Sequence, residues 1–142
     1  MLQEMERFCA YQERSPFEIR KKLMQKGASE AHIQWCIKTL VEKNFLHEDR
    51  FVQAYIEGKS NIKKWGVNKI TAGLRSHRIP DHLIQKNLCL LDKKEDLKHL
   101  TAWFEKKQLL LSNESDPRKK KQKMVRFLLG KGFPLDDILS LF

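Results

Sequence analysis

Apolar residues recur at a spacing of four along this chain, and one arrangement of them occurs three times. It consists of two apolar residues one helical turn apart, a turn residue four positions on, and a further apolar residue. Because residues four apart share one face of a helix, each copy predicts helix, turn and helix, and the threefold match predicts a repeat protein. The copies are Ile19, Leu23, Gly27 and Ile33; Ile70, Leu74, Arg78 and Ile84; and Met124, Leu128, Gly132 and Ile138.

Capping signals indicate where the helices begin and end. The segment Ser15-Pro16-Phe17-Glu18 is a capping box with proline at the first helical position. Gly27 and Gly132 stand where a helix commonly ends on a left-handed residue. Alternating strand patterns and hairpin-turn dipeptides are missing, so no strand is predicted. A further helix before each pair gives nine expected helices, at 1–13, 16–26, 30–44, 48–62, 67–77, 81–91, 93–111, 117–130 and 135–141.

The expected fold class is therefore all-α, with three tandem three-helix repeats at 1–46, 47–91 and 92–142. Three short helices bury little apolar surface alone, and repeat proteins solve this by stacking their units on one another. We therefore expect an elongated, curved helical solenoid.

Positive charge is concentrated in two stretches of the chain. Residues 58–79 and 118–131 contain thirteen lysines and arginines and no acid, more than the formal net charge of +10. Cations at 118–121 follow the helix start at Pro117, where they oppose the helix dipole by roughly 0.3–1 kcal/mol each. This placement favours a binding role with a polyanionic partner. The candidate basic face consists of Arg20, Lys21, Lys22, Lys63, Lys64, Lys69, Arg75, Arg78, Arg118, Lys119, Lys120, Lys121, Lys123 and Arg126.

Other chemistry is sparse. Cys9, Cys36 and Cys89 are far apart with no CxxC pair, which favours reduced, largely buried thiols over a disulfide or zinc site. No phosphate loop, HExxH motif or nucleophile constellation occurs, so we expect neither an enzyme nor a bound metal or cofactor. The chain contains no long apolar run and its first residues do not resemble a secretory signal, so we expect a cytoplasmic protein without membrane contact.

The three tryptophans have different surroundings. Trp35 and Trp103 sit among apolar helical residues and are expected in the core. Trp65 lies beside Lys63 and Lys64, where it could stack on a base or a partner side chain. It could equally pack against the helix that follows.

Four motifs along the chain resemble those of a known protein family. Residues 11–23 with Lys26-Gly27 are similar to the first repeat of the RecX family, and Phe45–Val52 is similar to its aromatic-L-D-D-x-R-F-A signature. Residues 64–79 and 127–138 resemble the next two elements, in the family's order. The residues that carry the motifs, mainly with structural roles, are Arg14, Ser15, Leu23, Gly27, Arg50, Phe51, Trp65, Gly66, Leu74, Phe127, Leu128 and Gly132.

The chain departs from the family pattern at two places. His47 and Glu48 replace a pair of aspartates, and Arg78 stands where glycine is common. We expect His47 to weaken the cap of the helix that begins at 48.

The resemblance implies a monomeric regulator, most simply an inhibitor, of the RecA recombinase. It implies binding along the RecA–single-stranded-DNA filament, with weaker binding to double-stranded DNA and a role in homologous recombination, DNA repair and the SOS response. The alternative is a nonspecific DNA-binding protein with helix-turn-helix-like units that acts independently of RecA. Residues 30–43 read mainly as core rather than as a base-reading helix, which disfavours sequence-specific binding.

Overall fold

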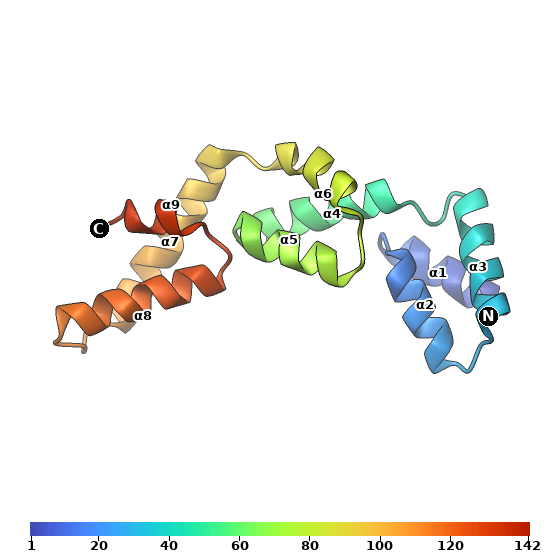
Figure 1. The fold of residues 1–142 in the computed structure, drawn as a ribbon, viewed down its shortest axis with the longest axis horizontal. Helices are drawn as coiled ribbons and strands as arrows, with labels where there is room; N and C mark the ends of the chain where they lie inside the picture. The colour runs from blue at the N-terminus through green and yellow to red at the C-terminus, as the bar shows by residue number, and fades with distance from the viewer. The chain divides into compact units, whose positions relative to one another are not determined.

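The structure, a computed structural model, describes all 142 residues and is entirely helical (Figure 1). The all-α class with three three-helix repeats is confirmed, and eight of the nine helices begin at the predicted residue. None of the helices combines the length and apolar character that a membrane span requires. The helices are α1 Leu2–Tyr11, α2 Pro16–Gln25, α3 Glu30–Glu42, α4 Glu48–Asn61, α5 Val67–Ser76, α6 Asp81–Asn87, η1 Leu88–Leu90, α7 Lys93–Leu110, α8 Pro117–Gly130 and α9 Leu135–Leu139.

The chain divides into two compact units. The first contains residues 1–55 and 74–87, and the second contains 56–73 and 88–142. The first repeat lies within the first unit and the third repeat within the second. The second repeat contributes to both, because α4 and α5 each supply residues to the two units.

In the first unit, α1 and α2 pack against α3 (Figure 1). The repeated apolar positions Ile19, Leu23 and Ile33 are at most 1% exposed, which confirms them as core. Ser15 forms the predicted capping box with Glu18, so α2 begins where the sequence indicates.

The same unit contains the start of α4, the end of α5 and α6. Asn87 ties α6 to α4, since its amide donates to Asp49 Oδ1 at 2.8 Å. That hydrogen bond and the nearby Lys86 lower the pKa of Asp49. His47 caps α4, because its Nδ1 accepts a hydrogen bond from Arg50 N at 3.2 Å. That this cap is weaker than the cap of an aspartate stays a prediction.

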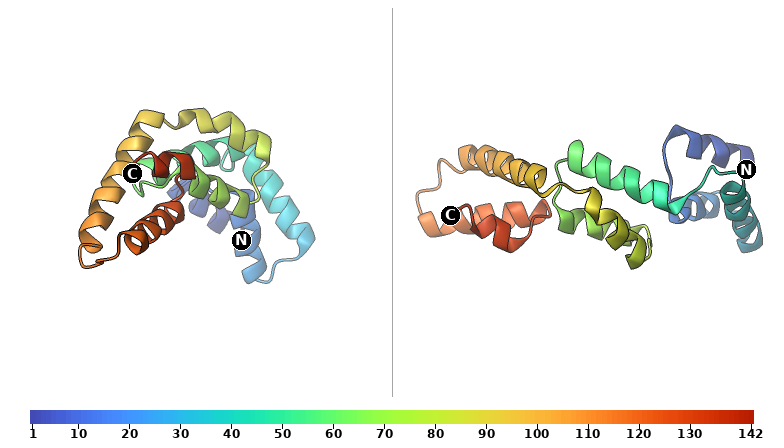
Figure 2. Two further views of the ribbon diagram at one scale, coloured as in Figure 1. Left: turned by 60° about the vertical axis from the view of Figure 1, so that its left-hand side comes forward. Right: turned by 90° about the horizontal axis from the view of Figure 1, so that it is seen from above.

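In the second unit, α8 packs against both α7 and α9, and Figure 2 shows these three helices close together in both views. The repeated positions Met124, Leu128 and Ile138 lie in a common core with Leu100 and Phe133. The repeat therefore places its apolar residues in the same way at both ends of the chain.

A left-handed residue occupies the same place in every repeat. Gly27 has φ of 80°, Arg78 of 57° and Gly132 of 97°. For Arg78 this conformation costs roughly 1–2 kcal/mol, because a Cβ atom crowds the following carbonyl oxygen. The repeat geometry thus requires a left-handed residue at this position. Two of the three copies have glycine there, and the second copy has Arg78.

Two expectations about burial were wrong. Trp35 is 52% exposed and stacks on His32, because the buried stripe of α3 is Ile33, Cys36 and Leu40 and leaves Trp35 to one side. Cys89 is exposed because the predicted helix at 81–91 tightens into the short η1 turn there. Cys9 and Cys36 are buried as expected, and burial raises the pKa of the Cys9 thiol to about 11.

Candidate functional site

The candidate basic residues lie mainly on α2, α5 and α8, the second helix of each repeat. On α2, Arg20 pairs with Glu30 at 2.7 Å and Lys22 lies 4.7 Å from the centre of the Phe8 ring. Lys21 is exposed and makes no ion pair. Of these three candidates on α2, only Arg20 therefore has a counter-ion.

Helix α8 exposes the densest group of cations. Arg118, Lys119, Lys120 and Arg126 make no ion pair, whereas Lys123 pairs with Glu114 at 2.6 Å. Asp116 caps the helix by accepting a hydrogen bond from Arg118 N. The capping carboxylate offsets part of the repulsion between the helix dipole and the cations that follow.

The outer face of α8 mixes charge with apolar surface. A shallow groove there is lined by Arg118, Lys121, Gln122, Val125, Arg126 and Leu129. Leu129 is 45% exposed, although the opposite stripe of the helix is fully buried. A cationic face with exposed aliphatic residues suits a protein partner as well as a polyanion.

Around α5 the candidate residues separate into two groups. In the first unit, Arg75 pairs with Asp81 and the Arg78 guanidinium lies 5.2 Å from the Phe17 ring centre. In the second unit, Lys63 and Lys64 are exposed in the turn before α5, and Lys69 lies 4.4 Å from the Trp65 ring centre. The sequence pattern predicts one basic face that contains these residues, but the structure distributes them over two compact units.

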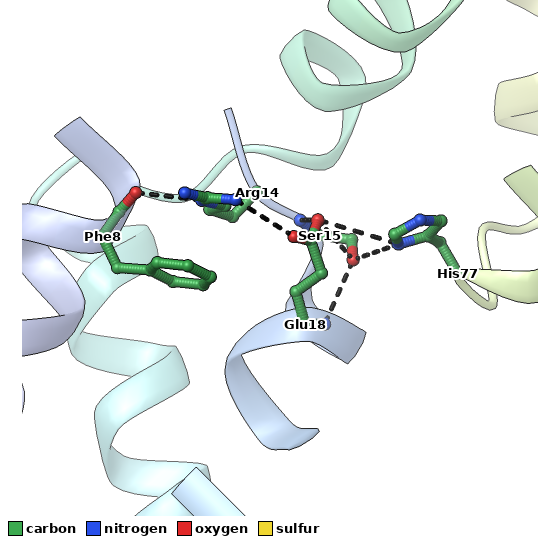
Figure 3. Close-up of polar contacts among 5 residues, drawn as sticks. All are labelled: Phe8, Arg14, Ser15, Glu18 and His77. Carbon is green, nitrogen blue, oxygen red and sulfur yellow. Dashed lines mark hydrogen bonds and ion pairs between the residues drawn. The ribbon is translucent and has the colours of Figure 1, made fainter. Parts of the chain in front are cut away.

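The turn before α2 meets the end of α5 within the first unit (Figure 3). Ser15 Oγ lies 2.9 Å from His77 Nδ1, and Glu18 Oε1 lies 3.7 Å from the same nitrogen. Arg14 donates to the carbonyl oxygen of Phe8 and reaches Glu18, which fixes the turn from the other side. Ser15 is fully buried, so this polar contact joins the first repeat to the second.

The equivalent turn of the second repeat makes the equivalent contact within the second unit. Gly66 N donates to Lys131 O and Asn68 N donates to Gly132 O, both at 2.8 Å. A Cβ atom on Gly66 would lie 2.5 Å from the carbonyl carbon of Gly132. In the repeat, Gly66 corresponds to Ser15 and Lys131 corresponds to His77. The contact between the first and second repeats is therefore made by side chains, and the contact between the second and third repeats is made by the backbone.

The remaining motif residues support these turns. Arg50 donates to the backbone oxygen and side-chain oxygen of Asn44, both at 2.9 Å. Phe51 is buried with its ring 5.0 Å from His77. Phe127 packs edge-on against Trp103. These contacts connect helices of the repeats to one another.

The structure also gathers basic residues that are not part of the candidate basic face. Lys106 and Lys107 on α7, and Lys131 after α8, lie over the rings of Trp103 and Phe127. Trp103 itself is partly buried against the core, and its indole N–H donates to Lys64 O at 2.9 Å. Lys131 is the last residue of the basic stretch 118–131, and membership of that stretch is the one feature of the sequence that indicates a role for it.

A mainly apolar pocket of about 270 Å³ lies between α7, α9 and the start of α5 in the second unit. Asp96 lines it, and burial together with Asp92 and Asp137 raises the pKa of Asp96 to about 6. Its Oδ1 atom is buried without a hydrogen-bond partner. The structure brings no group of three or more histidine, cysteine, aspartate or glutamate side chains into an arrangement for a metal ion.

Comparison with known proteins assigns each repeat separately. Family models of the first, second and third three-helix domains of RecX match residues 3–40, 48–88 and 94–142, in that order. Each of these models describes one three-helix domain.

Similar whole proteins share that description. The regulatory protein RecX of Clostridium perfringens (strain 13 / Type A) is 33% identical over 125 residues, which are 87% of this chain and 58% of that protein. The regulatory protein RecX of Haemophilus influenzae (strain PittGG) is 27% identical over 133 residues, which are 93% of this chain and 86% of that protein. This chain thus spans only 57–58% of the length of its clostridial relatives.

Solved structures show the same fold. The crystal structure of RecX from Lactobacillus salivarius superposes with a TM-score of 0.80 at 24% identity, covering 98% of this chain and 90% of that one. A second crystal structure, titled regulatory protein RecX, gives a TM-score of 0.86 at 20% identity and covers 98% of this chain and 69% of that one.

Proposed function

Because this chain belongs to the RecX family of regulatory proteins, we propose that it regulates the RecA recombinase by binding along the RecA–single-stranded-DNA filament. The observation that carries the proposal is the match of the family's three domains, each to one repeat and in the family's order. The regulation we propose is inhibition, in which the bound chain suppresses the ATPase and strand-exchange activities of the filament.

The charges of the chain suit such a partner. Five of the six cations of α8 have no ion pair, and the groove beside them is lined by Val125 and Leu129. A filament offers DNA phosphates and acidic protein surfaces, and both attract an unpaired cation. The exposed aliphatic residues add the apolar contact that a protein surface can supply.

Three repeats allow several weak contacts to act together. If repeats at 1–46, 47–91 and 92–142 each touch the filament, the second and third contacts form at a high effective concentration. A monomeric cytoplasmic protein could therefore act at less than one copy per RecA protomer. The more basic second and third repeats are the ones we assign to DNA.

The test is the single-stranded-DNA-dependent ATPase rate of the cognate RecA, titrated with this chain. We expect the rate to fall at ratios below one per protomer. A variant with Lys119, Lys120 and Lys121 changed to Glu should need a higher concentration for the same inhibition. Lys38→Glu is the control for each of the three changes made singly, because Lys38 is exposed on α3 and outside the candidate face. An unchanged rate at excess protein would contradict the proposal.

A second candidate function is nonspecific DNA binding without RecA. One observation favours it: α3, the second helix of the helix-turn-helix-like pair, exposes Trp35 and the neighbouring Gln34. Fluorescence anisotropy on naked DNA separates the two candidates. Tight binding to naked DNA together with an unchanged RecA ATPase would favour this function over the first.

A further inference from the structure

Three aromatic rings and three lysines converge in the second compact unit. We call this group the lysine–tryptophan cluster and define it as Lys69, Lys106, Lys131, Trp65, Trp103 and Phe127. Its members come from the turn before α5, from α5, from α7, and from α8 and the residue that caps it. No local stretch of sequence contains more than two of them, so only the folded unit assembles the group.

The rings hold the ammonium groups in place. Lys131 Nζ lies 4.1 Å from the centre of the Trp103 ring and 5.4 Å from that of Phe127. Lys106 Nζ lies 5.4 Å from the Trp103 ring centre. Cations are attracted to the faces of aromatic rings, and Trp103 is fixed by its hydrogen bond to Lys64 O. The lysine heads are therefore positioned before any ligand arrives.

The ring of Trp65 holds further ammonium groups in the same way. Lys69 Nζ lies 4.4 Å from the Trp65 ring centre and Lys59 Nζ lies 4.9 Å from it. The turn that carries Trp65 is itself tied down, because Gly66 N donates to Lys131 O. The backbone joint between the second and third repeats thus brings Lys69 and Lys131 near each other.

The charge of the cluster is not neutralised. Lys69, Lys106 and Lys131 make no ion pair with any acid of the chain, although ten ion pairs occur elsewhere in it. Burial, followed by the charges of Lys69 and Lys106, lowers the pKa of Lys131. Like charges held together without a counter-ion oppose folding, and such an arrangement is typical of a binding site for an anion.

We propose that the lysine–tryptophan cluster binds the phosphate groups of a nucleic-acid backbone. The proposal deepens the proposed function, on which it rests, by assigning the DNA contact to residues that are separate from the basic run on α8. The cluster contains lysine and no arginine, and lysine ammonium groups bind phosphate as point charges. A base stacking on a ring face covered by an ammonium group would displace that group, so the contact is made with phosphates.

The test compares two ligands of equal length by fluorescence anisotropy: oligothymidylate, and an abasic oligomer with the same phosphates and no bases. We expect Lys69→Gln and Lys131→Gln each to lower the affinity for both ligands equally, by about tenfold at 50 mM salt. Each change should also reduce, by about one, the slope of the logarithm of affinity against the logarithm of salt concentration. Unchanged affinity for both ligands would overturn the proposal. A loss confined to oligothymidylate would also overturn it, because it would mean base stacking.

Three controls make the result decisive. Lys98→Gln removes an equal charge from α7 outside the cluster, where Lys98 pairs with Glu95, and should leave the affinity within twofold. Thermal unfolding of Lys131→Gln should show no loss of stability, because the change removes repulsion. Polyglutamate of equal charge should bind more weakly than the abasic oligomer; tighter binding would make the site one for acidic proteins and overturn the proposal.

The measurement uses naked oligomers and needs no RecA. A loss of phosphate binding in the variants would therefore support the site even if the parent chain failed to inhibit the RecA ATPase. Inhibition by the parent chain with unaltered phosphate binding in both variants would support the proposed function and overturn the site.

Discussion

Replacing Asp96 with Asn should stabilise this chain at neutral pH. Asp96 lies in the first turns of α7 at the edge of the pocket beneath α9, with Oδ1 buried and unpartnered. Burial, Asp92 and Asp137 raise its pKa from 3.8 to about 6, and a hydrogen bond with Ser60 offsets only part of this. Because asparagine carries no charge, the substitution removes the cost of holding a carboxylate there.

The size of the effect follows from the difference between the folded and unfolded pKa. The full shift corresponds to a ceiling of about 3 kcal/mol, and the remaining solvent contact of the side chain reduces it to about 1–2 kcal/mol. A folded pKa above the unfolded one means that the folded state binds the proton more tightly. The stability that protonated Asp96 contributes to the folded state is therefore fully present below pH 4. This contribution falls as the pH rises from 4 to 6 and is lost above pH 6.

Urea unfolding at several pH values between 4.5 and 7.5 measures this directly. The free energy of unfolding of the variant should exceed that of the parent by an increasing amount as pH rises, with the full difference reached by pH 7. Thermal unfolding at pH 7 should then give a Tm that is higher by about 2–8 °C. Glu105→Gln, which removes a charge from the exposed side of α7, is the control and should show no such trend. A constant difference across this range, or a variant less stable at pH 7.5, would refute the reasoning.

Substitutions at three turn positions test the turns of the repeat, and Gly58→Ala within α4 is a comparison. Gly66→Ala should destabilise the chain by about 1–3 kcal/mol in urea unfolding, because its Cβ meets the Gly132 backbone at 2.5 Å. Gly58→Ala, in open space on α4, should instead stabilise it by about 0.5–1 kcal/mol. Arg78→Gly should be about 1 kcal/mol more stable than Arg78→Ala by thermal unfolding, because only glycine relieves the left-handed backbone; equal stability would contradict the strain. Ser15→Ala should cost about 1–3 kcal/mol by the same measurement, since it removes a buried cap and the contact with the second repeat; a loss below 0.5 kcal/mol on that scale would mean that the joint contributes little.

The positions of the helices could be read from the chain because they depend on neighbours in sequence. Apolar residues four apart, the Ser15 capping box and a helix start at Pro117 are interactions within one or two turns, and all appear in the structure as expected. The cap at His47 is also local, since the ring nitrogen reaches the amide of Arg50 three residues on.

The candidate site depended on contacts that no local pattern encodes. Trp35 reads as core beside Ile33 and Cys36, yet only the way α1 and α2 pack on α3 decides that it faces outward. The roles of Ser15 with His77 and of Gly66 with Lys131 arise because the turns of successive repeats meet.

The sequence by itself determined the helices, the threefold repeat and the excess of positive charge, because helix formation and net charge are local or additive properties. Tertiary structure alone decided which of those charges are neutralised. Folding pairs Arg20 and Arg75 with acids and leaves Lys131 among other lysines. The physical reason is that the energy of a charge depends on what lies within a few ångströms of it, and for residues from different helices that distance is set only when the repeats pack.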